Sequence, residues 1–244
     1  MGDTSAHRAV SELGTILSVW AHPDDECYLS AGLMALARDN GARVLCVTAT
    51  RGERGTDDPV AWPPDRLGPV REQELQRSMS ILGVTEHRFL GHCDGEVADV
   101  DDDVGVTQLA EIISELDPDT VVTFGPDGMT GHSDHVTVGR WATIAAQTAT
   151  SAPRVLHAAT DPAVMAAVDH HFDTFPVYGD DGPPIIDRNA AAVILELPDE
   201  TLERKVASLA AQPSQTEPLI AHMGEEDYRN WISVEVFVEP EKPV

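Results

Sequence analysis

Short apolar runs alternate with helix-forming stretches in the first half of the chain. The runs at 15–20, 43–50 and 120–124 have the length of buried strands. Between the first two runs, residues 28–38 are rich in helix formers, and Gly41 follows them, where glycine suits the position just after a helix. A strand, a helix and a second strand within about 35 residues predict a βαβ unit with parallel strands.

The rest of the chain continues this pattern with less contrast. A strand followed by a turn is expected at 86–95, and further strands at 190–197 and 231–238, the last of which alternates and is a candidate for a sheet edge. Helices are expected at 70–82, 107–116, 136–148, 161–173 and 198–211, and loops at 57–69 and 178–189. The sequence has no repeat or domain linker, and no GxGxxG motif follows the first strand. The order of elements predicts one α/β domain over residues 1–244.

The charge balance argues against several classes of protein. The chain has 42 acidic and 16 basic residues and a formal net charge of −26, so its surface repels nucleic acid and anionic membranes. Either adaptation to high salt or an acidic, arginine-preferring genome accounts for this balance. No apolar run approaches the roughly 20 residues of a membrane helix, and the N-terminus lacks the features of a signal peptide. We therefore expect a cytoplasmic protein. The three cysteines are too widely spaced for a disulfide framework or a thiolate zinc site.

Two polar clusters follow predicted strands. Ala21–Glu26 (AHPDDE) comes directly after the first strand and places one imidazole beside two adjacent carboxylates. Gly131–His135 (GHSDH) follows the strand at 120–124, and its two histidines are three residues apart, so they face one way in a helical turn. Ligands of open α/β sheets bind at the carboxyl ends of strands, which favours convergence of the two clusters. The alternatives are an acidic helix N-cap and an incidental histidine pair.

Together the clusters predict hydrolytic chemistry. His22, Asp25 and one histidine of the second cluster form a ligand set that suits zinc and leaves a position open for water, whose pKa zinc lowers. Other divalent ions can replace zinc, because this geometry selects weakly among them. Asp24 can then take a proton from the water, and the other histidine can stabilise the oxyanion of an attacked carbonyl. The expected reaction is hydrolysis of an amide or an ester.

The pairing of AHPDDE with GHSDH resembles the LmbE-like, or PIG-L, family of zinc-dependent N-deacetylases. This family includes deacetylases of mycothiol and bacillithiol biosynthesis and the enzyme that deacetylates N-acetylglucosaminyl-phosphatidylinositol. The resemblance implies a Rossmann-like three-layer α/β sandwich and an amino-sugar conjugate as substrate. It extends through most of the chain, in the stretches 50–56, 71–74, 81–83, 90–91 and 94–95, Lys205 and 214–215.

The resemblance also implies a role for each residue of the two clusters. The zinc ligands are His22, Asp25 and His135. Asp24 is the general base, and it can return the proton to the leaving amine. His132 polarises the carbonyl and stabilises the oxyanion, and Asp134 orients a histidine.

Four further residues match positions at which relatives meet their substrates. Arg71 and Asp94 correspond to groups that hold sugar hydroxyls, and Arg51 and Glu53 line the same rim. Taken alone, Arg71 is by default a solvated surface arginine, and Arg51 and Glu53 belong to a stretch that is equally an ordinary charged turn. The expected partner is a small amino-sugar conjugate, and the sequence leaves a homo-oligomer open.

The chain departs from the family pattern at three places. Ser133 stands where proline is usual, Gln212–Pro213 replaces a histidine before a Ser-Gln pair, and Thr130 occupies the place of a catalytic tyrosine of the mycothiol branch. These departures concern the substrate and leave the metal chemistry intact. The rival hypotheses are a sugar-binding protein without turnover and a metal-dependent esterase or amidase acting on another small conjugate. The presence of every expected ligand and of Asp24 favours the enzyme.

Overall fold

A seven-stranded sheet forms the centre of the computed structural model, which describes residues 3–240. Its strand order is β3-β2-β1-β4-β5-β7-β6. The first five strands are parallel, and β7 is antiparallel to both of its neighbours. The strands are β1 Ile16–Trp20, β2 Val44–Thr48, β3 Glu86–Phe89, β4 Thr120–Phe124, β5 Arg154–Ala159, β6 Val193–Glu196 and β7 Val234–Val238. The mostly parallel sheet confirms the predicted α/β fold class.

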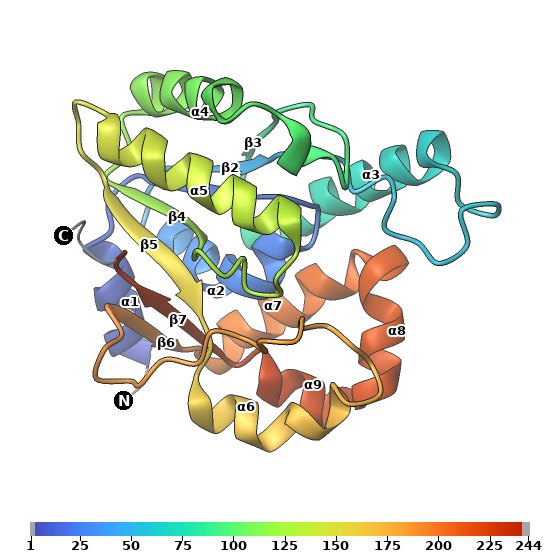
Figure 1. Ribbon diagram of the computed structural model, residues 1–244. Coiled ribbons are helices and arrows are strands. Elements are labelled where there is room, and N and C mark those ends of the chain that lie inside the picture. Colours follow the sequence, from blue (N-terminus) through green and yellow to red (C-terminus); the bar gives the residue numbers. More distant parts are fainter. Residues whose placement is uncertain (1–2, 241–244) are drawn as a thin grey trace.

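Helices cover both faces of the sheet (Figure 1). On one face lie α4 Asp102–Leu116 and α5 Ser133–Thr148. On the other lie α1 Asp3–Ser11, α2 Asp25–Asp39, α3 Pro64–Leu82 and α7 Asp199–Ala210. Three shorter helices, α6 Pro162–Val168, α8 Pro213–Met223 and α9 Glu225–Trp231, pack together at one end, and two 3₁₀ turns, η1 Val97–Asp99 and η2 Asp169–His171, complete the structure. The buried strands β1, β2 and β4 are apolar on both sides because helices cover both faces.

Some elements differ from the sequence predictions. Helix α3 begins at Pro64 rather than at residue 70, because proline is favourable at a first helical position and Pro69 removes only one intrahelical bond. The last strand is not at an edge, since β6 pairs along its other side. The helix expected at 161–173 divides into α6 and η2. Five elements were not predicted at all: α1, η1, β5, α8 and α9.

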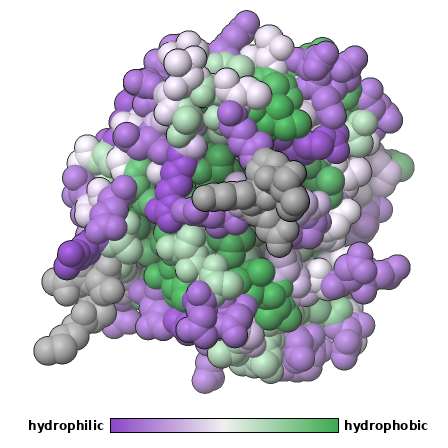
Figure 2. Space-filling view, turned by 60° about the vertical axis from the view of Figure 1, so that its left-hand side comes forward, coloured by the Kyte–Doolittle hydropathy of each residue, from purple (hydrophilic) through white to green (hydrophobic). Residues whose placement is uncertain are grey.

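The surface agrees with the acidic composition. Hydrophilic residues predominate on the face shown in Figure 2, with smaller hydrophobic patches between them. Within residues 3–240, no helix is both long enough and apolar enough to cross a membrane.

A buried ion pair joins α2 to α7 and β7. The Lys205 ammonium and the Glu235 carboxylate lie 2.8 Å apart, and both side chains are 1% exposed. Both groups also bond to the backbone of α2: Lys205 donates to the Tyr28 carbonyl, and Glu235 accepts from the amides of Gly32 and Leu33. Gly32 allows α2 to pack closely against Leu197, since a Cβ at this position would lie 2.3 Å from a Leu197 methyl group. The pair therefore fixes the helix that begins at the first polar cluster.

Replacing Lys205 with methionine should lower the free energy of unfolding by about 3–5 kcal/mol, because Glu235 would keep a buried charge without its cation. Urea unfolding followed by circular dichroism measures the change. Arg229→Met is the matched control: it breaks a more exposed pair with Glu203 and should cost less than about 1 kcal/mol. Equal stability of Lys205→Met and the parent protein would contradict the assignment.

Candidate metal centre

The two polar clusters meet at the carboxyl edge of the sheet. The turn that holds His22 joins β1 to α2, and the loop that holds His132 joins β4 to α5. Strands β1 and β4 are neighbours, and the chain runs outward from β1 through β2 and β3 before it returns to β4. The space between β1 and β4 is thus the topological switch point, where ligands of open α/β sheets bind. The predicted convergence of the two clusters is present in the structure.

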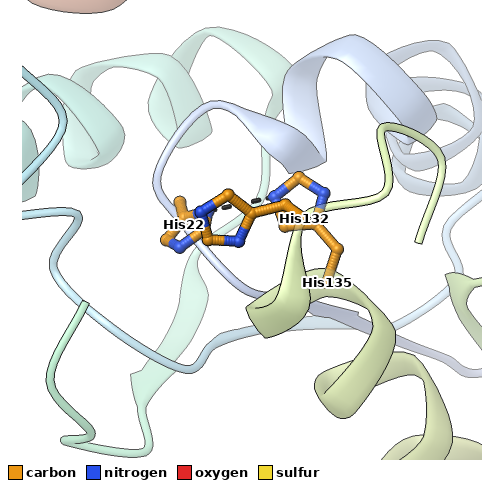
Figure 3. A group of neighbouring side chains, drawn as sticks. All are labelled: His22, His132 and His135. Atoms are coloured by element: carbon orange, nitrogen blue, oxygen red, sulfur yellow. Dashed lines mark hydrogen bonds between the residues drawn. The ribbon is translucent and has the colours of Figure 1, made fainter. Parts of the chain in front are cut away.

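Three histidines converge there (Figure 3), and the Asp25 carboxylate lies beside two of them. One ring nitrogen from each of His22, His132 and His135 lies within 4.8 Å of the others. Nδ1 of His22 is 3.0 Å from Nε2 of His135. The Asp25 oxygens lie 3.4 Å from Nε2 of His135 and 3.8 Å from Nδ1 of His22. Asp25 also accepts a hydrogen bond from the His22 amide at 2.8 Å, which fixes its carboxylate beside the rings.

In the rings of His22 and His135, the nitrogen that points away from the cluster is hydrogen-bonded. Its partner determines whether the other nitrogen is free to bind a cation. Nδ1 of His135 lies 3.0 Å from the Gly128 carbonyl oxygen, so it must donate. Nε2 of His22 lies 3.0 Å from an Asp94 oxygen and 3.2 Å from an Asp134 oxygen, so it too must donate. The remaining nitrogens, which face one another, then present lone pairs toward a common point beside Asp25. Two such imidazoles and a carboxylate fit a divalent cation, as in zinc sites with an open position.

The histidine pKa values show how the two rings are protonated when no cation is bound. Burial alone would lower the pKa of His22, but hydrogen bonds to Asp134 and Asp94 outweigh it and raise that pKa to about 10. Burial lowers the pKa of His135 to about 4. Without a cation, His22 is therefore protonated and His135 neutral at pH 7.

This proton makes metal binding depend on pH. Below pH about 10, a cation must displace the proton from His22, so affinity should rise about tenfold for each pH unit. Calorimetric titration with Zn²⁺ in buffers of different ionisation enthalpy should find about one proton released per metal near neutrality. An affinity that does not change with pH, with no proton released, would contradict the assignment.

Asp24 stands next to the cluster in an unusual backbone conformation. Its φ is 119°, a value that non-glycine residues rarely adopt and that costs of order 1–3 kcal/mol. It occupies the N-cap of α2, yet its side chain makes no capping hydrogen bond. Three contacts hold the turn: Glu26 accepts from the Asp24 amide at 3.0 Å, Arg71 donates to the Pro23 carbonyl at 2.5 Å, and Arg71 lies 3.4 Å from an Asp24 oxygen. Capping therefore does not explain Asp24, whose carboxylate lies beside Arg71.

The pKa of the Asp24 carboxyl is displaced upward. Burial raises the pKa of its carboxyl to about 7, against the opposing charge of Arg71. A general base works best when its pKa is near the operating pH. A cation bound at the cluster would lower this pKa and keep Asp24 ionised.

Arg71 is not a surface arginine. Its residue is 3% exposed, and besides Pro23 and Asp24 it contacts the Gly52 carbonyl at 2.7 Å. Gly52 and Gly55 make room for it, because a Cβ at either position would lie 2.2 or 2.4 Å from Nη1. The solvated alternative is thus wrong. The guanidinium holds the turn at Pro23 and Asp24, and its expected contact with substrate stays a prediction.

The other three expected substrate contacts lie on the β2 and β3 side of the cluster. Asp94 is 6% exposed, with one oxygen toward His22 and the other accepting from the Arg54 amide at 2.8 Å. Glu53 accepts from the Asp94 amide at 2.9 Å and so fixes that turn. Arg51 is exposed and lies 3.2 Å from Glu72. Arg51 and Glu53 line one surface cavity of about 540 Å³.

His132 and Asp134 lie at the start of α5. Nδ1 of His132 accepts from the Asp134 amide at 3.1 Å, so the neutral ring carries its proton on Nε2. Asp134 is fully buried, contacts His22, and accepts from the Gly95 and Val97 amides at 2.7 and 3.2 Å. His132 thus has a donor to offer, while Asp134 ties His22 to the turn after β3.

Sequence reasoning missed two contributors to the site. Glu26 clamps the Asp24 amide, and the Gly128 carbonyl sets the tautomer of His135. Glu26 belongs to the first motif, so its place there was the available signal. A backbone carbonyl carries no sequence signal.

Comparison with known proteins agrees with this geometry. Residues 17–146 match the PIG-L family model, described as GlcNAc-PI de-N-acetylase. A 1D-myo-inositol 2-acetamido-2-deoxy-alpha-D-glucopyranoside deacetylase of Streptomyces avermitilis is 34% identical over 215 residues, which cover 79% of this chain and 70% of that protein. The chain covers between 42% and 61% of seven further curated relatives with this printed activity.

Solved structures show the same fold at lower identity. The N,N'-diacetylchitobiose deacetylase from Pyrococcus horikoshii has a TM-score of 0.64 and 20% identity over 95% of this chain and 85% of that one. GalB, the 4-carboxy-2-hydroxymuconate hydratase of Pseudomonas putida, has a TM-score of 0.62 and 17% identity over 95% of this chain and 98% of that one. The fold alone therefore does not specify a reaction. The family match, the identity to the Streptomyces protein and the convergence of both motifs confirm that the chain belongs to the PIG-L, or LmbE-like, family.

Proposed function

We propose that this chain is a zinc-dependent hydrolase that removes an N-acyl group, acetyl in the simplest case, from an amino-sugar conjugate. The observation that carries the proposal is the placement of Asp24, ionisable and held in a strained turn, beside the cluster of His22, Asp25 and His135. The activities printed for the curated relatives supply the substrate class.

Each residue has a distinct part in the proposed reaction. A divalent cation held by His22, Asp25 and His135 supplies a Lewis acid, which increases the acidity of water and polarises a carbonyl oxygen. Asp24 accepts the proton of the attacking water. His132 donates from Nε2 to the carbonyl oxygen as negative charge develops there. The C–N bond then breaks as the nitrogen takes that proton from Asp24, which gives an amine and a carboxylic acid. The acid passes its own proton to the amine, so that the products leave as an ammonium group and a carboxylate.

Sugar binding is assigned to the β2 and β3 side of the cluster. Arg51 and Glu53 line a surface cavity on this side and are the proposed contacts to hydroxyl groups. Asp94 contacts His22, and Arg71 donates hydrogen bonds to backbone carbonyls. Either residue can contact a sugar directly only if these interactions are replaced by bonds to the sugar. Asp134 orients His22 in this proposal.

The direct test is release of acetate and amine from N-acetylglucosaminyl-inositol and N-acetylglucosamine. We expect both products in equal amounts, their loss after treatment with a chelator, and their return with added Zn²⁺. The corresponding O-acetyl ester tests the esterase alternative. Binding of the sugar without release of product by the metal-loaded protein would favour the non-catalytic alternative and overturn the proposal.

A further inference from the structure

A second, apolar cavity adjoins the cluster. Its volume is about 240 Å³, and Asp25 and His135 form one end of it. Those two residues face Nδ1 of His22, whereas Asp94 and Asp134 face Nε2. The walls come from α2, α6, the loop after η2, α8 and α9 and include Tyr28, Val164, Phe175, Tyr178, Leu219 and Trp231. The Asp94 and Asp134 carboxylates thus lie on one side of the cluster, and the apolar cavity lies on the other.

Several polar groups in the cavity wall already have partners, and the buried Asp161 oxygen that makes no hydrogen bond lies 3.2 Å from the Arg188 guanidinium. Glu235 accepts from Lys205 and from two α2 amides. Gln215 donates to the Gly55 carbonyl, and Thr160 donates to the Met129 sulfur. A sugar placed in this cavity would lose hydrogen bonds to water and find few replacements, which is costly. An apolar chain would gain from the same transfer.

We propose that this cavity holds the N-acyl chain of the substrate and that the chain is longer than acetyl. This inference rests on the proposed function. A scissile amide presents the sugar on its nitrogen side and the acyl chain on its carbonyl side. Asp25 and His135 of the cluster line the apolar cavity, whereas Glu53 of the polar cavity is linked to His22 through the Asp94 turn. A cavity of about 150 Å³ is sufficient to bind benzene, so this larger one exceeds the needs of a single methyl group. The medium-length chain leaves as its carboxylate when water attacks the carbonyl carbon and the C–N bond breaks.

The test compares N-acetyl-, N-butanoyl-, N-hexanoyl- and N-octanoyl-glucosamine. We expect kcat/KM to rise by about twofold to fourfold for each added methylene until the cavity is full. Val164→Trp fills the cavity from α6 and should lower the ratio of octanoyl to acetyl kcat/KM by about tenfold or more. Val177→Phe is a second filling variant should the first fail to fold. Val104→Trp, at a position on α4 that is 47% exposed, is the matched control and should keep the parent ratio.

Binding measurements separate this inference from the proposed function. Calorimetry on the Asp24→Asn protein should find tighter binding of N-octanoyl-glucosamine than of N-acetyl-glucosamine, a difference that Val164→Trp removes. If that holds but no substrate is hydrolysed by the parent, the proposed function fails and the cavity assignment stands. Hydrolysis of all chain lengths with one kcat/KM, unaffected by Val164→Trp, would overturn the cavity assignment alone. Binding of n-octyl β-glucoside as tight as that of N-octanoyl-glucosamine would also overturn it, because that alkyl chain lies at the anomeric end of the sugar.

Discussion

Replacing Asp24 with asparagine should lower kcat/KM by about 10²- to 10⁴-fold while the bound cation is retained. The change removes the proton acceptor but keeps the size of the side chain. Asp25, by contrast, is beside both imidazoles, and its carboxylate is committed to the cluster. Metal analysis and steady-state kinetics on the same preparation measure both quantities.

Asp25→Asn is the matched control for this pair of neighbours. It should lose metal, whereas Asp24→Asn should not. A metal-free Asp24 variant beside a metal-loaded, inactive Asp25 variant would mean that the two roles are reversed. An active Asp24→Asn enzyme would place the proton on another group, of which His132 is the nearest histidine outside the proposed ligand set.

His135→Ala should remove most of the bound metal and, with it, the activity. His135 contributes one of the two facing lone pairs, so its loss should weaken metal binding by more than the about 10- to 100-fold typical of removing an outer hydrogen-bond partner. Metal content after dialysis and a competition titration with a chromophoric chelator measure the change. Circular dichroism checks the fold, because the ring of His135 also stacks on Phe124.

His132→Ala distinguishes the two histidines of the second cluster. It should retain metal and lose turnover, since its proposed part is hydrogen-bond donation to the developing oxyanion, an interaction whose removal costs about 10²- to 10³-fold in kcat. If His132→Ala loses the metal and His135→Ala keeps it, the ligand set is His22, Asp25 and His132. The structure brings all three rings close enough for this outcome to be a real test.

The sequence predicted those elements whose place in the tertiary structure leaves a local pattern of apolar residues. Buried parallel strands are continuous apolar runs, so β1, β2 and β4 could be recognised, and the motifs at their carboxyl ends had to meet. Strand β5 was missed because Arg154 and His157 interrupt its apolar run.

The rest depends on contacts between distant segments. The burial of Arg71 follows from carbonyls of Pro23 and Gly52, which have no side-chain signature. The positive φ of Asp24 is imposed by its surroundings against the preference of the residue. The apolar cavity draws its walls from elements spread between α2 and β7, and two of the contributing helices, α8 and α9, were not recognised in the sequence.

Because β7 lies between β5 and β6, it determines the order in which the strands can join the sheet. Among the described residues, β6 pairs with no strand except β7, although it is synthesised first. During vectorial synthesis, β6 must therefore wait for the last strand to emerge before it can join the sheet. The same strand brings Glu235 to α2 and Val236 to the cavity wall. A nascent chain thus holds both polar clusters well before β7 supplies the support behind α2.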